Sequence, residues 1–293
     1  MKYLKIFSLI YFIFLCCSIL ADDNLKKAIE LYELKKYHQA KSLLEKIIDQ
    51  DEKNETAYFY LGRTYFELSD YDEAGDNFEE ALDLNEKNAE YHYWLAWAYG
   101  FEARDANIFT KTFLSPKIKK HFEAAVKINP KHVDARIGLA NYYIMAPGIL
   151  GGDIKKAHEQ ANKIIEFDEK QGRFLLAGIY QKEKNFKKAE NECKWLEEKY
   201  GNDPGFYNFY NIYGYILLEQ KRFDEAIEKF KKQVNLAPDQ ANPHDSLGDA
   251  YRAAGKNNEA IEEYKKAIEM DPSNKYSKEK LNELRKKEKL DKK

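Results

Sequence analysis

The sequence has few cysteines, and it has neither a bilayer-length apolar segment nor an excess of positive charge. Only three of its 293 residues are cysteine, and Cys193 is the only one outside the N-terminal region, which excludes an internal disulfide framework there. The apolar run Ile6–Leu20 has 15 residues, whereas a membrane-spanning helix needs ~20. With 48 basic and 50 acidic side chains, the composition argues against nucleic acid as a partner.

The first residues have the pattern of a secretory signal. Lys2 and Lys5 precede the apolar run, and Ala21 follows it, directly before Asp22 and Asp23. A basic start, a short apolar middle and a small residue at the end are typical of a cleaved signal. We therefore expect residues 1–21 to be a signal peptide, no transmembrane segment after its cleavage, and an exported protein, periplasmic or extracellular.

A lipid anchor is the alternative for this segment, because a bacterial lipoprotein signal also ends at a cysteine. Cys16 and Cys17 are the two candidates, and a small residue should precede the modified one. The large Leu15 precedes Cys16, and Phe14 lies just before it. These neighbours favour the cleaved signal over the lipid anchor.

After the first residues, the chain repeats a simple spacing in which a small residue is followed twelve positions later by alanine. Five pairs obey it: Ala28 and Ala40, Gly62 and Ala74, Ala177 and Ala189, Gly214 and Ala226, Gly248 and Ala260. Each pair falls in two consecutive segments whose apolar residues have helical spacing. Two small residues on antiparallel helices let the backbones approach closely while larger side chains fill the flanks.

This pattern resembles the tetratricopeptide repeat family. Residues 55–88 contain it whole, with Tyr58, Leu61, Gly62, Tyr65, Tyr71, Ala74, Phe78 and Ala81. The resemblance implies an all-α, right-handed superhelical solenoid of seven antiparallel helix pairs over residues 22–274. The expected repeats are about 21–54, 55–88, 89–132, 133–169, 170–203, 207–240 and 241–274. Residues 275–293 are expected to form a capping helix and a lysine-rich tail.

Two insertions interrupt the repeat, and both are expected to form loops between paired helices. One loop is predicted at residues 104–114 and the other at 146–153, where Pro147, Gly151, Gly152 and Asp153 are also ordinary helix punctuation. Repeats that stack in register would place both loops on one edge. The functional interpretation is an apolar edge patch for a partner, formed by Phe109, Ile149 and Leu150.

The family resemblance also implies a concave groove lined by one stripe of each first helix. The residues predicted to form this binding groove are Phe59, Arg63, Tyr93, Trp97, Asn141, Asn211, Tyr215, Asp249 and Arg252. Aromatic and arginine side chains dominate protein interfaces, and amide or guanidinium groups suit a peptide backbone or carboxylate. The alternative interpretation is that Tyr93 and Trp97 simply pack onto the next helix.

A search for catalytic or metal-binding residues gives none. His158 and Glu159 begin like a zinc-protease helix, but Asn162 stands where the second histidine ligand must be. The other histidines are expected to be single surface or packing residues, and Cys193 falls at an interior position where cysteine acts as a small apolar filler. We therefore predict no catalytic residue, no metal site and no cofactor.

The sequence thus favours a non-enzymatic scaffold that binds a protein or peptide partner in the cell envelope or outside the cytoplasm. One rival is a small-ligand or transporter-accessory protein whose pocket is closed by the 104–114 and 146–153 loops. A second rival is a hydrolase that uses paired acidic residues in the groove.

Overall fold

The computed structural model describes residues 23–291, with side chains described through residue 286. Over this range the chain forms α-helices and two short 3-10 turns and contains no strand. The all-α prediction is therefore confirmed. The expected signal peptide, with Cys16 and Cys17, lies outside the described residues.

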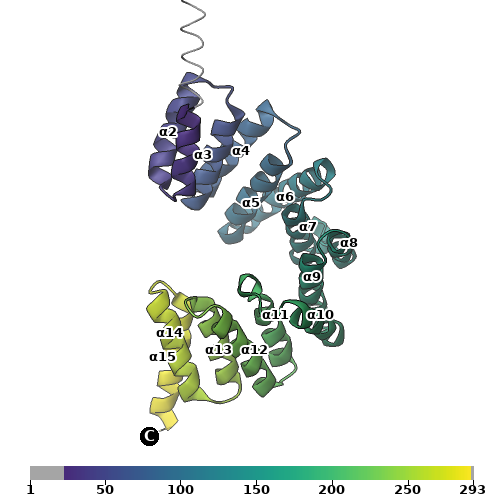
Figure 1. The fold of residues 1–293 in the computed structure, drawn as a ribbon, viewed down its shortest axis with the longest axis vertical. Coiled ribbons are helices and arrows are strands. Elements are labelled where there is room, and N and C mark those ends of the chain that lie inside the picture. The colour runs from purple at the N-terminus through teal and green to yellow at the C-terminus, as the bar shows by residue number, and fades with distance from the viewer. Residues whose placement is uncertain (1–22, 292–293) are drawn as a thin grey trace, which may run out of the picture. The chain divides into compact units, whose positions relative to one another are not determined.

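The helices follow one another in antiparallel pairs joined by short turns (Figure 1). They are a helix over residues 23–33, α2 (Tyr37–Gln50), α3 (Glu55–Glu67), α4 (Tyr71–Leu84), α5 (Ala89–Asp105), α6 (Ile108–Ile128), α7 (Val133–Met145), η1 (Gly148–Leu150), α8 (Ile154–Ile165), α9 (Glu169–Lys182), α10 (Phe186–Tyr200), η2 (Pro204–Phe206), α11 (Phe209–Glu219), α12 (Phe223–Leu236), α13 (Ala241–Ala253), α14 (Asn257–Met270) and α15 (Lys275–Asp291).

The chain divides into two compact units, and the boundary falls within α8. The first unit ends at Gln160 and the second begins at Ala161. The core of the first unit includes Leu44, Phe78 and Leu95, all fully buried. Phe209 and Phe230 are equally buried in the core of the second unit.

Small residues bring the paired helices together as the spacing predicted. All five alanines at the second position of the pairs have no exposed surface. A Cβ atom added at Gly62 would lie 2.8 Å from the ring of Phe78 and 3.1 Å from the carbonyl oxygen of Ala74. Because an ordinary van der Waals contact is longer, only glycine fits at this crossing of α3 and α4.

The turn within a pair recurs with the same backbone conformation. The second residue after the first helix has a left-handed φ at Lys35 (57°), Ser69 (66°), Lys184 (57°), Lys221 (60°) and Gly255 (75°). At Ser69 the turn is closed by hydrogen bonds from Ser69 N to Phe66 O and from Asp70 N to Tyr65 O. These two bonds satisfy carbonyl groups that a helix end would otherwise leave unpaired.

The loop predicted at residues 104–114 is wrong. Helix α5 continues to Asp105 and α6 begins at Ile108, so only Ala106 and Asn107 separate them. The Asn107 side chain accepts hydrogen bonds from the backbone N–H groups of Phe109 and Thr110, which starts the new helix at once. The inserted residues therefore lengthen both helices of the pair. The rival hypothesis of a ligand pocket closed by two loops lacks one of those loops.

The segment 146–153 is a connection, as predicted. It contains Pro147, the 3-10 turn η1 and Gly151, whose φ is 94°. Asp153 accepts a hydrogen bond from Lys155 N at the start of α8. Gly152 does not have a left-handed φ. Its role is a close approach, because an added Cβ would overlap the carbonyl of Ala146.

Helix α15 closes the second unit with an amphipathic face. Leu281 and Leu284 are buried against Ile261 and Tyr264 of α14.

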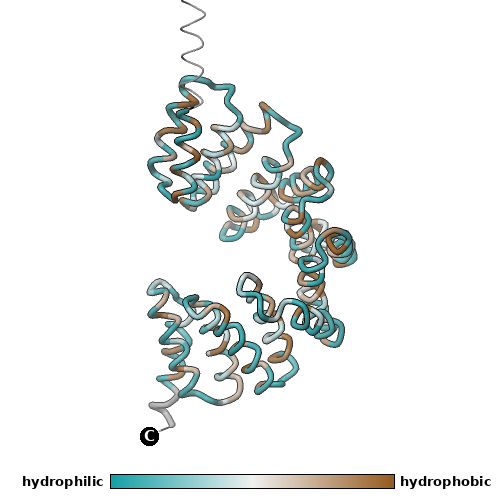
Figure 2. The backbone as a smooth tube through the Cα atoms, viewed as in Figure 1, coloured by the Kyte–Doolittle hydropathy of each residue, from teal (hydrophilic) through white to brown (hydrophobic). Residues whose placement is uncertain are grey.

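Hydrophobic and hydrophilic residues alternate along the other helices too (Figure 2). Across residues 23–291, no helix combines the length and apolar character that crossing a membrane requires.

Candidate functional site

The first unit holds an arginine between two aromatic rings. Arg63, on α3, has its guanidinium carbon 4.7 Å from the centre of the Tyr32 ring and 4.6 Å from that of Trp94. Its Nε atom is buried without a hydrogen-bond partner, and no ion pair joins Arg63 to any residue between 23 and 286. Cation–π contacts thus hold the guanidinium group of Arg63 in place, and its N–H groups have no anionic partner.

The aromatic residues around Arg63 continue along the first unit as a chain of ring contacts. Phe59 packs on Tyr91 with ring centres 4.8 Å apart, while Tyr93 and Trp97 both contact Phe122 at 6.3 and 6.0 Å. Phe59, Tyr93 and Trp97, the groove aromatics predicted in this unit, are each half-buried. They therefore pack onto neighbouring helices and retain some accessible surface, and their place in a groove stays a prediction.

Two acidic residues, Glu90 and Asp134, lie near these aromatic residues, and neither forms an ion pair with Arg63. Glu90 Oε1 lies 3.1 Å from His132 Nε2. The hydrogen bond with His132 lowers the pKa of Glu90, although burial opposes that shift, and the more distant charge of Arg63 adds to it. Burial raises the pKa of Tyr93 to about 12, helped by the charge of Asp134. Tyr93 is therefore a neutral hydroxyl at physiological pH.

Asn141 lies on α7, on the same unit, and is half-buried. No hydrogen bond of its side chain to another described residue is found. Its amide is thus chemically available, as the groove prediction requires. Its place in a groove stays a prediction.

The second unit presents a different arrangement, centred on the buried carboxylate of Asp249 on α13. Tyr215 of α11 and Tyr264 of α14 donate hydrogen bonds to it at 2.9 and 2.7 Å. Tyr276 of α15 donates to both of its oxygens at 2.7 and 2.8 Å. Arg252 Nη2 lies 3.7 Å from Asp249 Oδ1. One carboxylate therefore ties four helices together.

Most of the polar groups predicted for the groove in the second unit form hydrogen bonds within the fold. Asp249 is only 8% exposed, and burial together with its charge raises the pKa of Tyr215, Tyr264 and Tyr276. Asn211 donates to Ser246 Oγ at 2.7 Å. Arg252, by contrast, is exposed. Among these residues, Arg252 is therefore the one whose side chain is best placed to contact a partner.

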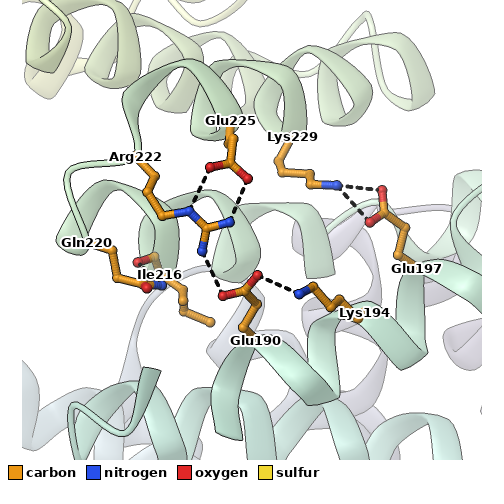
Figure 3. A network of polar contacts seen from close by, with 8 residues as sticks. All are labelled: Glu190, Lys194, Glu197, Ile216, Gln220, Arg222, Glu225 and Lys229. Carbon is orange, nitrogen blue, oxygen red and sulfur yellow. Dashed lines mark hydrogen bonds and ion pairs between the residues drawn. The ribbon is translucent and has the colours of Figure 1, made fainter. Parts of the chain in front are cut away.

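A second polar network ties α10 to α12 on the surface of the second unit (Figure 3). Arg222 makes a two-pronged contact with Glu225 at 2.7 and 2.6 Å and donates to Glu190 at 2.8 Å. Burial would raise the pKa of Glu190, but hydrogen bonds from Arg222 and Lys194 outweigh it and lower that pKa. The charges of this network are thus paired with one another, and the network stabilises the packing of α10 and α12.

The residues predicted for an edge patch lie in the first unit. Phe109 is 83% exposed near the start of α6, and Ile149 is 94% exposed in η1. Leu150 is half-buried. The turn η1 contacts α6, so the structure brings the two segments together.

The histidines and the cysteine offer little chemistry. Within residues 23–286 no group of three or more His, Cys, Asp or Glu side chains is arranged to hold a metal ion. The expectation of single histidines is wrong for one pair, because His92 and His121 face each other across α5 and α6 with their Nδ1 atoms 2.9 Å apart. Cys193 is fully buried, and burial raises the pKa of its thiol, which disfavours the reactive thiolate.

Sequence reasoning missed several residues of these sites. Tyr32 and Trp94 flank Arg63 but lie on other helices, and Tyr264 and Tyr276 reach Asp249 from α14 and α15. All four are aromatic, and the sequence offered no signal for which charged residue each ring would meet. The contacts depend on side-chain directions that spacing along one helix does not give.

Comparisons with known families find three matching segments. A family model described as tetratricopeptide repeat matches residues 173–241, and one described as TPR repeat matches residues 248–276. A model described as regulator of microtubule dynamics protein 1-3 matches residues 24–142.

Two solved structures are similar to the chain over most of its length. A tetratricopeptide repeat protein from Parabacteroides merdae matches with a TM-score of 0.70 and 18% identity, covering 90% of this chain and 98% of that one. The Cut9-Hcn1 hetero-tetramer of APC/C matches with a TM-score of 0.59 and 14% identity, covering 88% of this chain and 48% of that one. At these identities the likeness establishes the fold.

One curated protein is similar in sequence, the human protein O-mannosyl-transferase TMTC1. It is 27% identical over 168 residues, which is 56% of this chain. The match spans 18% of the length of that protein. The likeness therefore concerns a minor part of the relative.

Proposed function

Because this chain is a tetratricopeptide repeat protein, we propose that it is a non-enzymatic scaffold that binds an extended segment of a partner protein outside the cytoplasm. The repeats support protein interaction as its general role. The fold is typically a binding scaffold, and one similar structure, Cut9-Hcn1, is itself a complex. The basic start and apolar run of the first 21 residues support export.

The observation that carries the proposal is the unpaired guanidinium of Arg63. A cation fixed between two rings loses little side-chain entropy when it binds, and its remaining N–H groups can donate to a carboxylate. We therefore propose that the partner segment carries an acidic side chain, which binds Arg63. The half-buried rings of Phe59, Tyr93 and Trp97 supply apolar contact beside it.

The binding test uses peptide libraries with and without a fixed glutamate, presented to the full chain and to Arg63→Gln. We expect selection of the glutamate library and about tenfold weaker binding by the variant, because one charge-assisted contact is lost. Arg104→Gln is the matched control, since this exposed arginine of the same unit already pairs with Asp105 at 3.0 Å. Equal binding by Arg63→Gln and the unchanged chain would overturn the role of Arg63.

Export is tested separately. Mass spectrometry of the protein recovered from cells should find a mature N-terminus at Asp22, and fractionation should place the protein outside the cytoplasm. An intact Met1 in the cytoplasmic fraction would contradict export and would leave the binding proposal standing.

A further inference from the structure

A stripe of exposed apolar residues covers the start of α6. Ile108 is 67% exposed, Phe109 83% and Phe113 64%. Thr112 and Pro116 are exposed on the same side, so the stripe follows the spacing i, i+1, i+4, i+5 and i+8 and carries no charge. The opposite side of the helix is buried at Leu114. The stripe is thus a second apolar face, which the fold of residues 23–286 leaves uncovered.

Two further apolar side chains project from the neighbouring connection. Met145, at the end of α7, is 80% exposed and Ile149, in η1, is 94% exposed. Tyr142 fixes this connection to α6, because its hydroxyl lies 2.9 Å from Ser115 Oγ and also donates to the carbonyl oxygen of Leu150. We name the five residues Ile108, Phe109, Phe113, Met145 and Ile149 the apolar edge.

The charges beside the apolar edge are strongly biased, although the whole chain is slightly acidic. Residues 108–120 include four lysines, Lys111, Lys117, Lys119 and Lys120, and neither aspartate nor glutamate, and Lys155 and Lys156 follow η1. Lys117 lies over the Phe113 ring at 5.0 Å and contacts Glu79 at 3.7 Å, while Lys119 contacts Glu123 at 3.8 Å.

Acidic groups also flank the segment, and Glu102 and Asp76 interact with Lys117 in addition to Glu79. Asp105 pairs with Arg104, and Asp153 accepts a hydrogen bond from the backbone of Lys155. Lys111 and Lys120 are exposed and no ion pair is found for either within the described chain. Lys111 and Lys120 therefore place positive charge without an ionic partner beside the apolar edge.

We infer that the apolar edge docks on the surface of an anionic lipid membrane. Bulky apolar side chains bordered by lysines are the combination that inserts into the headgroup region while the ammonium groups bind anionic lipids. The edge consists of side chains projecting from a helix start and a tight turn, and such tips suit insertion between headgroups. Exposed apolar surface of this kind in a folded protein marks an interaction site. The inference does not depend on the partner proposed for Arg63.

The test measures flotation of the full chain with vesicles of phosphatidylcholine alone or with phosphatidylglycerol added. We expect binding to the anionic vesicles that weakens as salt is raised, because the lysine contribution is screened. Phe109→Ser/Phe113→Ser should bind about tenfold less, and Lys111→Glu/Lys120→Glu should lose the preference for anionic lipid. These positions are exposed, so thermal melting of all variants should match that of the unchanged chain.

Two matched controls keep the result specific. Leu34→Ser changes another exposed apolar side chain of the first unit, and Lys46→Glu reverses another exposed lysine there; both should bind like the unchanged chain. Vesicle binding that the edge variants do not alter would overturn the inference and assign it to another segment, such as the apolar run 6–20. Loss of self-association by Phe109→Ser/Phe113→Ser, without vesicle binding by the unchanged chain, would overturn it in favour of a protein interface.

Discussion

The two units use the same helix position in opposite ways. Arg63 is the ninth residue of α3 in the first unit, and Asp249 is the ninth residue of α13 in the second. The arginine lies between aromatic rings without an ionic partner, whereas the aspartate accepts hydrogen bonds from three tyrosines. One position therefore supplies an available charge in the first unit and a structural anchor in the second.

The repeat pattern determines the position of a residue on its helix. The surrounding side chains determine whether that residue is available for binding or stabilises the fold. Tyr32 and Trp94 offer only their ring faces to Arg63, which leaves its guanidinium without a hydrogen-bond acceptor inside the fold. Tyr264 and Tyr276 present hydroxyl groups to Asp249, which satisfies the carboxylate inside the fold. A binding role follows from unsatisfied polar groups, and a stability role follows from satisfied ones.

The largest effect should come from removing the anchor. Asp249→Ala leaves three tyrosine hydroxyls without their acceptor, and hydrogen bonds to a charged group contribute about 1.5–3 kcal/mol each. Because Tyr276 is partly exposed and can rebind water, we expect a loss of about 3–4 kcal/mol in the free energy of unfolding, measured by urea denaturation. Asp239→Ala, at an exposed acid of the same unit, should change it little. Equal losses would contradict the anchor.

The next effect should be the same in both units, because both use close packing of alanine at the helix crossings. Ala74→Leu and Ala226→Leu each force a larger side chain into a fully buried helix crossing, and overpacking costs about 1–3 kcal/mol. Calorimetry should detect a lower melting temperature for both. Ala253→Leu, at an exposed position of α13, is the control. Unchanged melting of either core variant would count against close packing in that unit.

A smaller effect, confined to the first unit, concerns pH. Burial and the adjacent His92 and lysines lower the pKa of His121 to about 4, while an unfolded histidine has a pKa near 6.5. Between these values the unfolded chain binds more protons, so stability is full above pH ~6.5 and falls as the pH drops towards 4. After allowance for partial exposure we expect a loss of about 1–2 kcal/mol.

Chemical denaturation at a series of pH values measures this slope. His121→Gln should flatten it, and His38→Gln, at an exposed histidine of the same unit, should leave it as it is. A slope that survives in His121→Gln would assign the acid sensitivity to other groups.

The smallest effect on stability is expected at Arg63. Arg63→Met removes the cation–π contacts, which contribute about 0.5–1 kcal/mol each at partly exposed sites, and the methionine keeps part of the packing against the rings. We expect a net loss below about 1 kcal/mol by urea denaturation, well under that of Asp249→Ala. A loss as large as that of Asp249→Ala would make Arg63 a structural residue and would end the contrast between the units.

The sequence predicted the fold more fully than the sites. Small residues twelve positions apart located the helix crossings, because close packing restricts what these positions can hold. The predicted loop at 104–114 failed because extra residues between two helices can join either helix, and Asn107 starts α6 almost where α5 ends. Among the predicted site residues, Asp249 and Asn211 form contacts with α14, α15 and Ser246 that no single-helix pattern encodes.

The recurring left-handed turn has a consequence for engineering. Of the five residues in this conformation only Gly255 is a glycine, while Lys35, Ser69, Lys184 and Lys221 carry side chains that this backbone region disfavours. Replacing one of them by glycine relieves about 1–2 kcal/mol of strain against an entropic cost of about 0.5–1 kcal/mol. The net gain is then about 0–1.5 kcal/mol at each turn, and gains at separate turns should add. The natural chain thus keeps an unused reserve of thermal tolerance in the turns that close its helix pairs.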